Sequence, residues 1–471
     1  MVVRSLPAAA AAAAAATAAA VFALSACTSS AVVRDAPGTD ASGGPASTTS
    51  RSAPRGPAYP DWPAYHGDAA RSGLSTSMPA VRGTPRVSAT IRLDAAAYAQ
   101  PIVARGLTIV ATENDSVYAF DAANHRVWHV RLGRPSPAGE RPCGNIDPFG
   151  ITGAPVYSNG LVYVAAEYGG PPRHELVALE VATGTVRWRR NLDLPGADPA
   201  AMQERGALAV ADGRIWVPFG GLAGDCGDYK GRVVAFALNG SGAPLSYTVP
   251  TAREAGIWAP PGPVVAADGR LFVAVGNGAA VHGAPYDHSD SVLELDRDAR
   301  LLDSFSPASW AQDNAADLDL GSQGPALVGK WIFAAGKSGT AYVLRQARLG
   351  GIGGEVSQAT ECRSFGGTAV VGDVVYVPCT DGVRAVQIDE AGRLHMLWHA
   401  DGSISGSPVV GGGRVWSLDV SAGVLHALDP ATGRSMAQVA VGQTTRFATP
   451  ALSGNRVLVA TLAGLTVVTT S

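Results

Sequence analysis

The sequence predicts an all-β fold, specifically an eight-bladed β-propeller with four strands in each blade, and seven blades as the alternative. Short apolar, β-branched segments separated by glycine turns recur between residues 100 and 470. No long segment has the 3.6-residue period of a helix. The pattern repeats every ~40–55 residues, the length of one propeller blade.

The repeat begins with residues 101–110, which form two short apolar segments around a Gly turn. Residues 117–121 continue this first unit, and Trp128 marks a fourth strand. The second unit runs from Pro155 to Trp188. Related units begin near Leu208, Pro263, Pro325, Ala369, Pro408 and Pro450.

The two ends of the repeat region each leave one strand without a partner. The last unit stops after residues 465–468 and lacks an outer strand. Residues 86–93, ahead of the first unit, form a spare strand. Pairing between them would remove two exposed edges, so we expect this N-terminal strand to close the ring.

The N-terminal residues predict export rather than structure. Residues 1–27 contain an early Arg4, an alanine-rich apolar run, and small residues directly before Cys27. This ending resembles the lipobox of bacterial lipoproteins, in which the cysteine carries the lipid; an ordinary signal peptide is the alternative. Residues 28–60 read as a flexible linker and residues 61–471 as the propeller. We therefore expect an exported protein, lipid-anchored at the outer face of the cell membrane.

Four further cysteines, an even number in an exported chain, suggest disulfides. Three pairings are possible, and free buried thiols are the alternative. We favour Cys362 with Cys379, because they are close in sequence and flank one hairpin, which leaves Cys143 with Cys226.

Charge and motifs exclude several classes of function. The net charge is −3 and no basic block stands out, so nucleic-acid binding is not expected. The histidines lack metal-site spacing, and His395 and His399 fall on one expected outer strand at the surface. The polar loop at residues 286–290 could bind an ion or simply be a loop.

Three segments carry a resemblance to a known family. Residues 178–188 and 427–433 resemble the repeat of the quinoprotein-like propellers, and residues 62–73 resemble the opening segment of that superfamily. The resemblance covers about residues 60–471 and implies the propeller fold. It does not choose a function, because that fold hosts dehydrogenases and assembly scaffolds alike.

In quinoprotein alcohol dehydrogenases, pyrroloquinoline quinone and Ca²⁺ occupy the central funnel. Local resemblance to these enzymes implies that Glu167, Asn277 and Asp319 would ligate the calcium ion. Trp258 would stack on the quinone and Lys337 would lie near its oxygens. Asp319 would also be the catalytic base.

Each of these matches has a structural alternative, such as blade packing for Trp258 or a turn for Asn277. The chain also departs from the family pattern. The family's adjacent cysteine pair is missing, since Cys143 stands alone, and Val275 replaces the expected threonine. The segment around Asp319 is one residue shorter.

Two functions follow as hypotheses. The first is a non-catalytic binding or scaffold module, similar to the lipoprotein of the outer-membrane assembly machinery, with a protein or small molecule at its loops. The second is a quinone- and calcium-dependent dehydrogenase of an alcohol or sugar, which requires Glu167, Asn277 and Asp319 to converge near Trp258. No cofactor is certain from sequence, and a monomer is expected because ring closure hides the strand edges.

Overall fold

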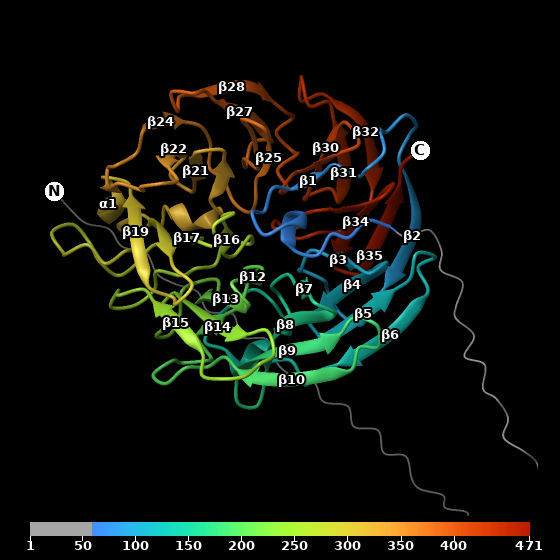
Figure 1. Cartoon of the computed structure of the whole chain (residues 1–471), viewed down its shortest axis with the longest axis horizontal. Coiled ribbons are helices and arrows are strands. Elements are labelled where there is room, and N and C mark those ends of the chain that lie inside the picture. The colour runs from blue at the N-terminus through green and yellow to red at the C-terminus, as the bar shows by residue number, and fades with distance from the viewer. Residues whose placement is uncertain (1–58) are drawn as a thin grey trace, which may run out of the picture. The chain divides into compact units, whose positions relative to one another are not determined.

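The computed structural model describes residues 59–471, which form eight β-sheets arranged in a ring (Figure 1). This confirms the eight-bladed propeller over the seven-bladed alternative. The expected signal peptide, the lipidation site at Cys27 and nearly all of the linker lie outside the described residues. Within residues 59–471 no helix is long and apolar enough to cross a membrane.

Blades 1 to 4 contain the first half of the strands. Blade 1 has β3 (Ile102–Ala104), β4 (Leu107–Thr112), β5 (Ser116–Phe120) and β6 (Arg126–Arg131). Blade 2 has β7 (Val156–Ser158), β8 (Leu161–Tyr168), β9 (Arg173–Glu180) and β10 (Val186–Asn191). Blade 3 has β12 (Ala209–Ala211), β13 (Arg214–Gly221), β14 (Arg232–Ala237), β15 (Leu245–Thr248) and the added β11 (Met202–Gln203). Blade 4 has β16 (Val264–Val265), β17 (Leu271–Val275), β18 (Ser291–Leu295), β19 (Leu301–Ser306) and the added β23 (Gly351–Ile352).

Blades 5 to 8 complete the ring. Blade 5 has β20 (Ala326–Val328), β21 (Trp331–Ala335), β22 (Thr340–Arg345) and β24 (Ser357–Thr360). Blade 6 has β25 (Ala369–Val371), β26 (Val374–Val377), β27 (Arg384–Ile388) and β28 (Leu394–His399). Blade 7 has β29 (Val409–Gly411), β30 (Arg414–Asp419), β31 (Val424–Leu428), β32 (Ser435–Ala440) and the added β1 (Leu74–Ser75). Blade 8 has β33 (Ala451–Ser453), β34 (Arg456–Thr461), β35 (Gly464–Thr469) and β2 (Arg86–Arg92). The described helices are α1 (Trp310–Ala315) and the short 3₁₀ turns η1 (Tyr65–Gly67), η2 (Ala138–Glu140) and η3 (Leu320–Ser322).

The predicted repeat and its closure match these strands. The innermost strands β12, β16, β20, β25, β29 and β33 begin at or one residue after the predicted unit starts. The N-terminal strand β2 (blue) runs antiparallel to β35 (red), from Arg86 opposite Thr469 to Arg92 opposite Gly464 (Figure 1). This confirms closure of the ring by the two ends of the repeat region.

A tryptophan on the outer strand of a blade packs against the next blade and hydrogen-bonds to it. The indole nitrogen of Trp128 in blade 1 donates to the carbonyl of Val181 in blade 2, at 2.9 Å. The ring lies against Gly184, in the Thr-Gly turn of the repeat. Trp398 in blade 6 packs in the same way on Gly433 of blade 7. The tryptophan and Thr-Gly signals of the repeat are therefore explained by packing between blades.

The segment from Trp62 to Ser75 crosses the inner strands of the ring. Its backbone forms hydrogen bonds of 2.7–2.9 Å with residues of blades 1, 2, 4, 6 and 7, namely Val103, Tyr157, Val265, Val370 and Val410. His66 of this segment is fully buried; its Nδ1 lies 2.9 Å from the carbonyl of Thr368 and its Nε2 lies 3.0 Å from the Thr449 hydroxyl. The segment thus ties distant blades to one another near the ring axis.

We expect His66 to make the fold sensitive to acid. Burial lowers the pKa of His66 to about 3, whereas an unfolded chain has a histidine pKa of about 6.5. Between these values the unfolded chain binds the extra proton, so stability falls as pH decreases. The free energy of unfolding should therefore fall by up to about 1.4 kcal/mol per pH unit below pH ~6 through this group, and His66→Gln should remove that slope.

The measurement is urea unfolding between pH 7 and pH 5. His125→Gln is the control, because the His125 side chain is 79% exposed. Equal slopes in the wild type and His66→Gln would show that His66 does not act in this way.

Candidate functional site

A cavity of about 640 Å³ lies at the loops of several blades. Four residues expected at a cofactor site line it together: Trp258, Asn277, Asp319 and Lys337. The same wall also contains groups that sequence reasoning did not select: Tyr98, Arg205, Asp225, Tyr229, Asp317, Phe365, Thr444, Thr445, Arg446 and Phe447.

Asp319 is the best-anchored polar group of the cavity. Its carboxylate is almost fully buried, at 2% exposure, just ahead of η3. Oδ2 lies 2.5 Å from Nζ of Lys337, and Oδ1 accepts a hydrogen bond from the backbone N–H of Asn277 at 2.5 Å. Lys337 also contacts Oδ1 of Asp317, at 2.6 Å. Burial raises the pKa of Asp319, and the Lys337 ammonium opposes that rise.

Small and polar residues behind the cavity allow this close packing. A Cβ at Gly276 would stand 2.7 Å from Oδ1 of Asp319 and 3.0 Å from the indole nitrogen of Trp258. The buried Asp290 accepts a hydrogen bond from the N–H of Leu320 at 2.9 Å and so holds the segment that bears Asp319. Asp290 belongs to the polar loop at residues 286–290. The polarity of that loop was the only feature of the sequence that could have indicated its contact with the Asp319 segment.

Aromatic rings and cations alternate along the cavity wall. Trp258 meets Phe447 edge to face, with centroids 6.0 Å apart. The guanidinium of Arg205 lies 5.0 Å from the Phe447 centroid, and that of Arg446 lies 5.0 Å from the Phe365 centroid. Such a wall suits a ligand with a flat ring and negative charge.

Glu167 is placed elsewhere. It lies near the end of β8, is 1% exposed, and is not among the residues that line the cavity. Its Oε2 lies 3.0 Å from Arg141, its Oε1 accepts a hydrogen bond from the N–H of Glu204 at 2.7 Å, and His174 lies 3.6 Å away. Burial lowers the pKa of His174, but the Glu167 charge and its other acidic partner raise it overall to about 9.

The expected calcium ligands are therefore not brought together. Asn277 and Asp319 both line the cavity, whereas Glu167 pairs with Arg141 and His174. A calcium site needs several oxygens converging at about 2.3–2.6 Å from one ion. The cavity brings the Trp258 ring close to the Lys337–Asp319 ion pair, but the predicted three-residue set does not fit calcium.

Further carboxylates lie buried near Glu167. Burial raises the pKa of Glu113 to about 8 and that of Asp115 to about 9, and it raises the pKa of Glu204 strongly. Glu113 accepts hydrogen bonds from the N–H of Gly150 and the hydroxyl of Thr152. Glu113 and Asp115 are therefore mainly uncharged at neutral pH, and the ion pair of Arg141 is with Glu167.

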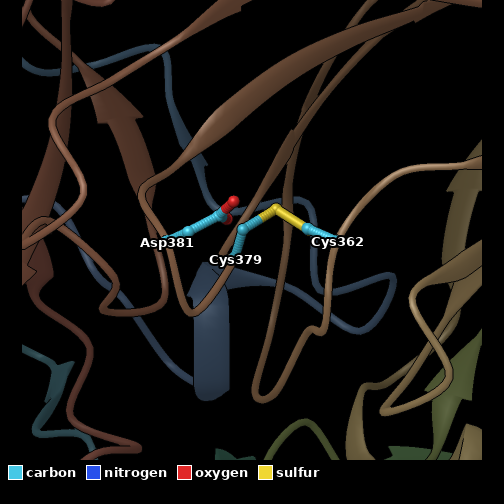
Figure 2. A group of neighbouring side chains, drawn as sticks. All are labelled: Cys362, Cys379 and Asp381. Atoms are coloured by element: carbon cyan, nitrogen blue, oxygen red, sulfur yellow. A yellow bond between two sulfur atoms is a disulfide. The ribbon is translucent and has the colours of Figure 1, made fainter.

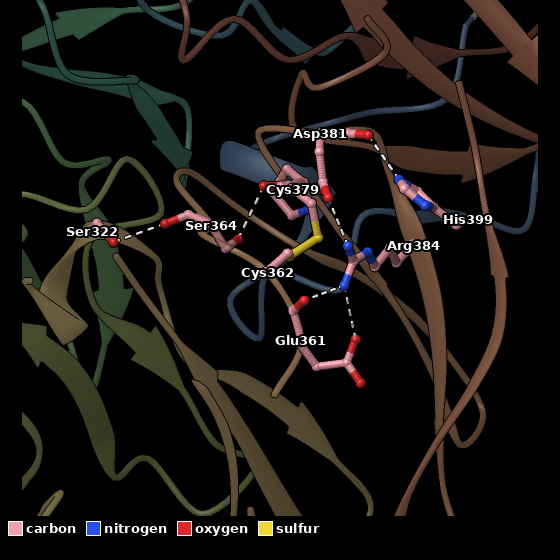
Figure 3. Close-up of a disulfide and its surroundings, with 9 residues drawn as sticks. Ser322, Glu361, Cys362, Ser364, Cys379, Asp381, Arg384 and His399 are labelled. Carbon is pink, nitrogen blue, oxygen red and sulfur yellow. Dashed lines mark hydrogen bonds and ion pairs between the residues drawn. A yellow bond between two sulfur atoms is a disulfide. The ribbon is translucent and has the colours of Figure 1, made fainter. Parts of the chain in front are cut away.

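Both predicted disulfides are present, Cys143–Cys226 and Cys362–Cys379. Figure 2 shows Cys362 and Cys379 beside Asp381. The two sulfur atoms and a carboxylate oxygen of Asp381 lie within 4.8 Å of one another, a spacing that could suit a metal ion. Because the two sulfurs are bonded to each other, they offer no thiolate to a metal ion. Figure 3 shows that Arg384 instead joins Glu361 to Asp381 around this disulfide.

Comparison with known proteins finds similarity to PQQ-repeat propellers. The family described as outer membrane protein assembly factor BamB matches residues 147–348. A polyvinylalcohol dehydrogenase of Sphingopyxis sp. (strain 113P3) is 28% identical over 163 residues, which are 30% of this chain and 24% of that protein. The match thus spans about a quarter of that relative's length.

Two solved structures share the fold. Quinohemoprotein alcohol dehydrogenase from Comamonas testosteroni superposes with a TM-score of 0.66 at 16% identity, covering 87% of this chain and 80% of that one. BamB from Moraxella catarrhalis superposes with a TM-score of 0.55 at 18% identity, covering 83% of this chain and 98% of that one. The chain is therefore similar, in fold over most of its length and in sequence over its middle part, to PQQ-repeat propellers of the quinoprotein type.

Proposed function

We propose that the protein is a lipid-anchored binding module of the cell envelope whose propeller holds a small molecule in its central cavity. The convergence of Trp258, Asn277, Asp319 and Lys337 on one cavity of about 640 Å³ carries the proposal. Ligand pockets of this size, with aromatic walls and a few fixed polar groups, are typical of small-molecule sites. The anchor at Cys27 would hold the propeller at the outer face of the membrane.

Ligand-induced stabilisation of the whole protein tests the proposal. A small-molecule library should contain compounds that raise the thermal midpoint, because a ligand at roughly 100 times its Kd stabilises the folded state by about 2.7 kcal/mol. Trp258→Ala and Asn277→Ala should each abolish that increase, whereas Asn191→Ala, on an exposed strand end, should keep it. If no compound acts through Trp258 or Asn277, the cavity is not a ligand site.

A quinone-dependent dehydrogenase of an alcohol or sugar is the second candidate. It is favoured by the order along the chain of Trp258, Asn277, Asp319 and Lys337, which follows the order of the matching positions in quinoprotein alcohol dehydrogenases. It is disfavoured by the engagement of Glu167 with Arg141. A protein partner at the propeller loops stays a prediction.

Titration with pyrroloquinoline quinone, with and without Ca²⁺, separates the two candidates by quenching of tryptophan fluorescence. Saturable, calcium-dependent quenching that Asn277→Ala abolishes and Asn191→Ala retains would support the dehydrogenase. Asn191 is a suitable control because it is exposed and is not among the residues that line the cavity. Calcium-independent quenching, or none, would exclude the calcium-dependent enzyme.

A further inference from the structure

Two arginines on the cavity wall have no carboxylate partner. Within residues 59–471, neither Arg205 nor Arg446 forms an ion pair, and the polar contact of Arg205 is a 3.3 Å hydrogen bond to Oε1 of Gln203. Lys337, by contrast, is neutralised by two aspartates. The remaining acid of the wall, Asp225, accepts a hydrogen bond from the Tyr229 hydroxyl at 2.5 Å.

The two guanidinium groups lie over aromatic rings instead of pairing with carboxylates. Each lies 5.0 Å from the centroid of a phenylalanine ring, Arg205 over Phe447 and Arg446 over Phe365. A guanidinium has five N–H donors, and a contact with a ring leaves most of them available to another partner. Those donors match a carboxylate in a bidentate arrangement.

In the part of the chain that the structure describes, two threonines on the same loop place unpaired hydroxyl groups beside this wall. Thr444 and Thr445 directly precede Arg446, and both line the cavity. Thr444 is 8% exposed, and the Oγ1 atoms of both threonines are buried without a hydrogen-bond partner among the described residues. A buried hydroxyl without a partner costs free energy unless something satisfies it.

We propose that this wall, formed by Arg205, Arg446, Thr444 and Thr445, binds the carboxylate of a small aromatic acid without any metal ion. The ring of the acid would lie among the aromatic side chains that line the cavity. The buried Glu113 does not cancel the Arg205 charge at neutral pH, because burial raises the pKa of its carboxyl group to about 8. The inference rests on the proposed function and adds to it the chemical class of the ligand.

Calorimetric titration of the whole protein in EDTA tests this, with isophthalate as the probe and isophthalamide as its uncharged analogue. Isophthalate should bind, and isophthalamide should bind at least about tenfold more weakly, since charge-assisted hydrogen bonds are about twice as strong as neutral ones. Arg446→Gln and Arg205→Gln should each weaken isophthalate binding about tenfold. Arg434→Gln, an exposed arginine of blade 7 outside the cavity, should change nothing.

Arg446 is exposed, so its replacement tests binding without endangering the fold. Equal affinity for the two probes, an unchanged Arg446→Gln variant, or no isophthalate binding would each overturn the inference. Library compounds that still act through Trp258 would then leave the proposed function standing. If no compound acts through Trp258 or Asn277, the proposed function itself has failed.

Discussion

Arg141→Met should lower the free energy of unfolding by about 3–5 kcal/mol, the usual cost of removing one partner from a buried ion pair. The Arg141 side chain has no exposed surface and its guanidinium contacts Glu167, Ser136 and the carbonyl of Met202, each at 3.0 Å. Its loss would leave His174, 3.6 Å away, as the remaining ion-pair partner of the buried Glu167 carboxylate. Urea unfolding at neutral pH with the disulfides intact measures the change.

A matched exposed pair provides the control for Arg141. Arg134, which is 58% exposed, pairs with Glu140 on the same loop, and Arg134→Met should cost less than about 1 kcal/mol. Adding Glu167→Gln to Arg141→Met should recover part of the loss, because the orphaned charge disappears. Similar losses from the Arg141 and Arg134 variants would mean that the buried pair does not stabilise the blade 1 to blade 3 region.

The fold could be predicted from the sequence because the blade is a local unit repeated along the chain. Each unit has its own apolar strands and glycine turn, and often an outer tryptophan. A unit with an ambiguous pattern can therefore be assigned by comparison with the clearer units. Closure was predictable as well, because residues 86–93 and the last unit were each one strand from completing a sheet. Both disulfides followed from four cysteines and one short spacing, and the structure contains both.

The candidate site was predictable only in part. Asn277 and Lys337 follow the equivalent strands β17 and β21 of neighbouring blades, which a repeat makes visible, whereas Trp258 and Asp319 lie in connections between blades. Glu167 lies near the end of strand β8 of blade 2, but it pairs with Arg141 from a preceding loop, and no local pattern reveals that partner.

Other cavity residues carried no usable signal in the sequence. Arg205, Arg446 and Phe447 reach the cavity through connections between blades. The conformation of such connections depends on the whole ring rather than on neighbouring residues. The roles of the site residues toward a ligand stay predictions.

Gly433→Ala should be strongly destabilising, because a backbone cost and a packing cost fall on one residue. Gly433 has φ +72°, where an alanine costs ~1–2 kcal/mol. A Cβ there would also stand 2.4 Å from the ring of Trp398, and overpacking a filled contact costs ~1–3 kcal/mol more. We expect a total loss of about 2–5 kcal/mol in the free energy of unfolding, measured in urea.

Gly413 separates the two costs, because it lies in the same blade with the same φ of +72° and nothing within 4 Å of its Cβ position. Gly413→Ala should therefore show the backbone cost alone. Gly184 and Gly213 repeat the comparison elsewhere in the ring: both have φ +72°, but only Gly184 lies against a tryptophan, Trp128. If each tryptophan-packed glycine loses more than its open counterpart, the Thr-Gly signal of the repeat is maintained by contact between blades. Equal losses would reduce that signal to the geometry of a turn.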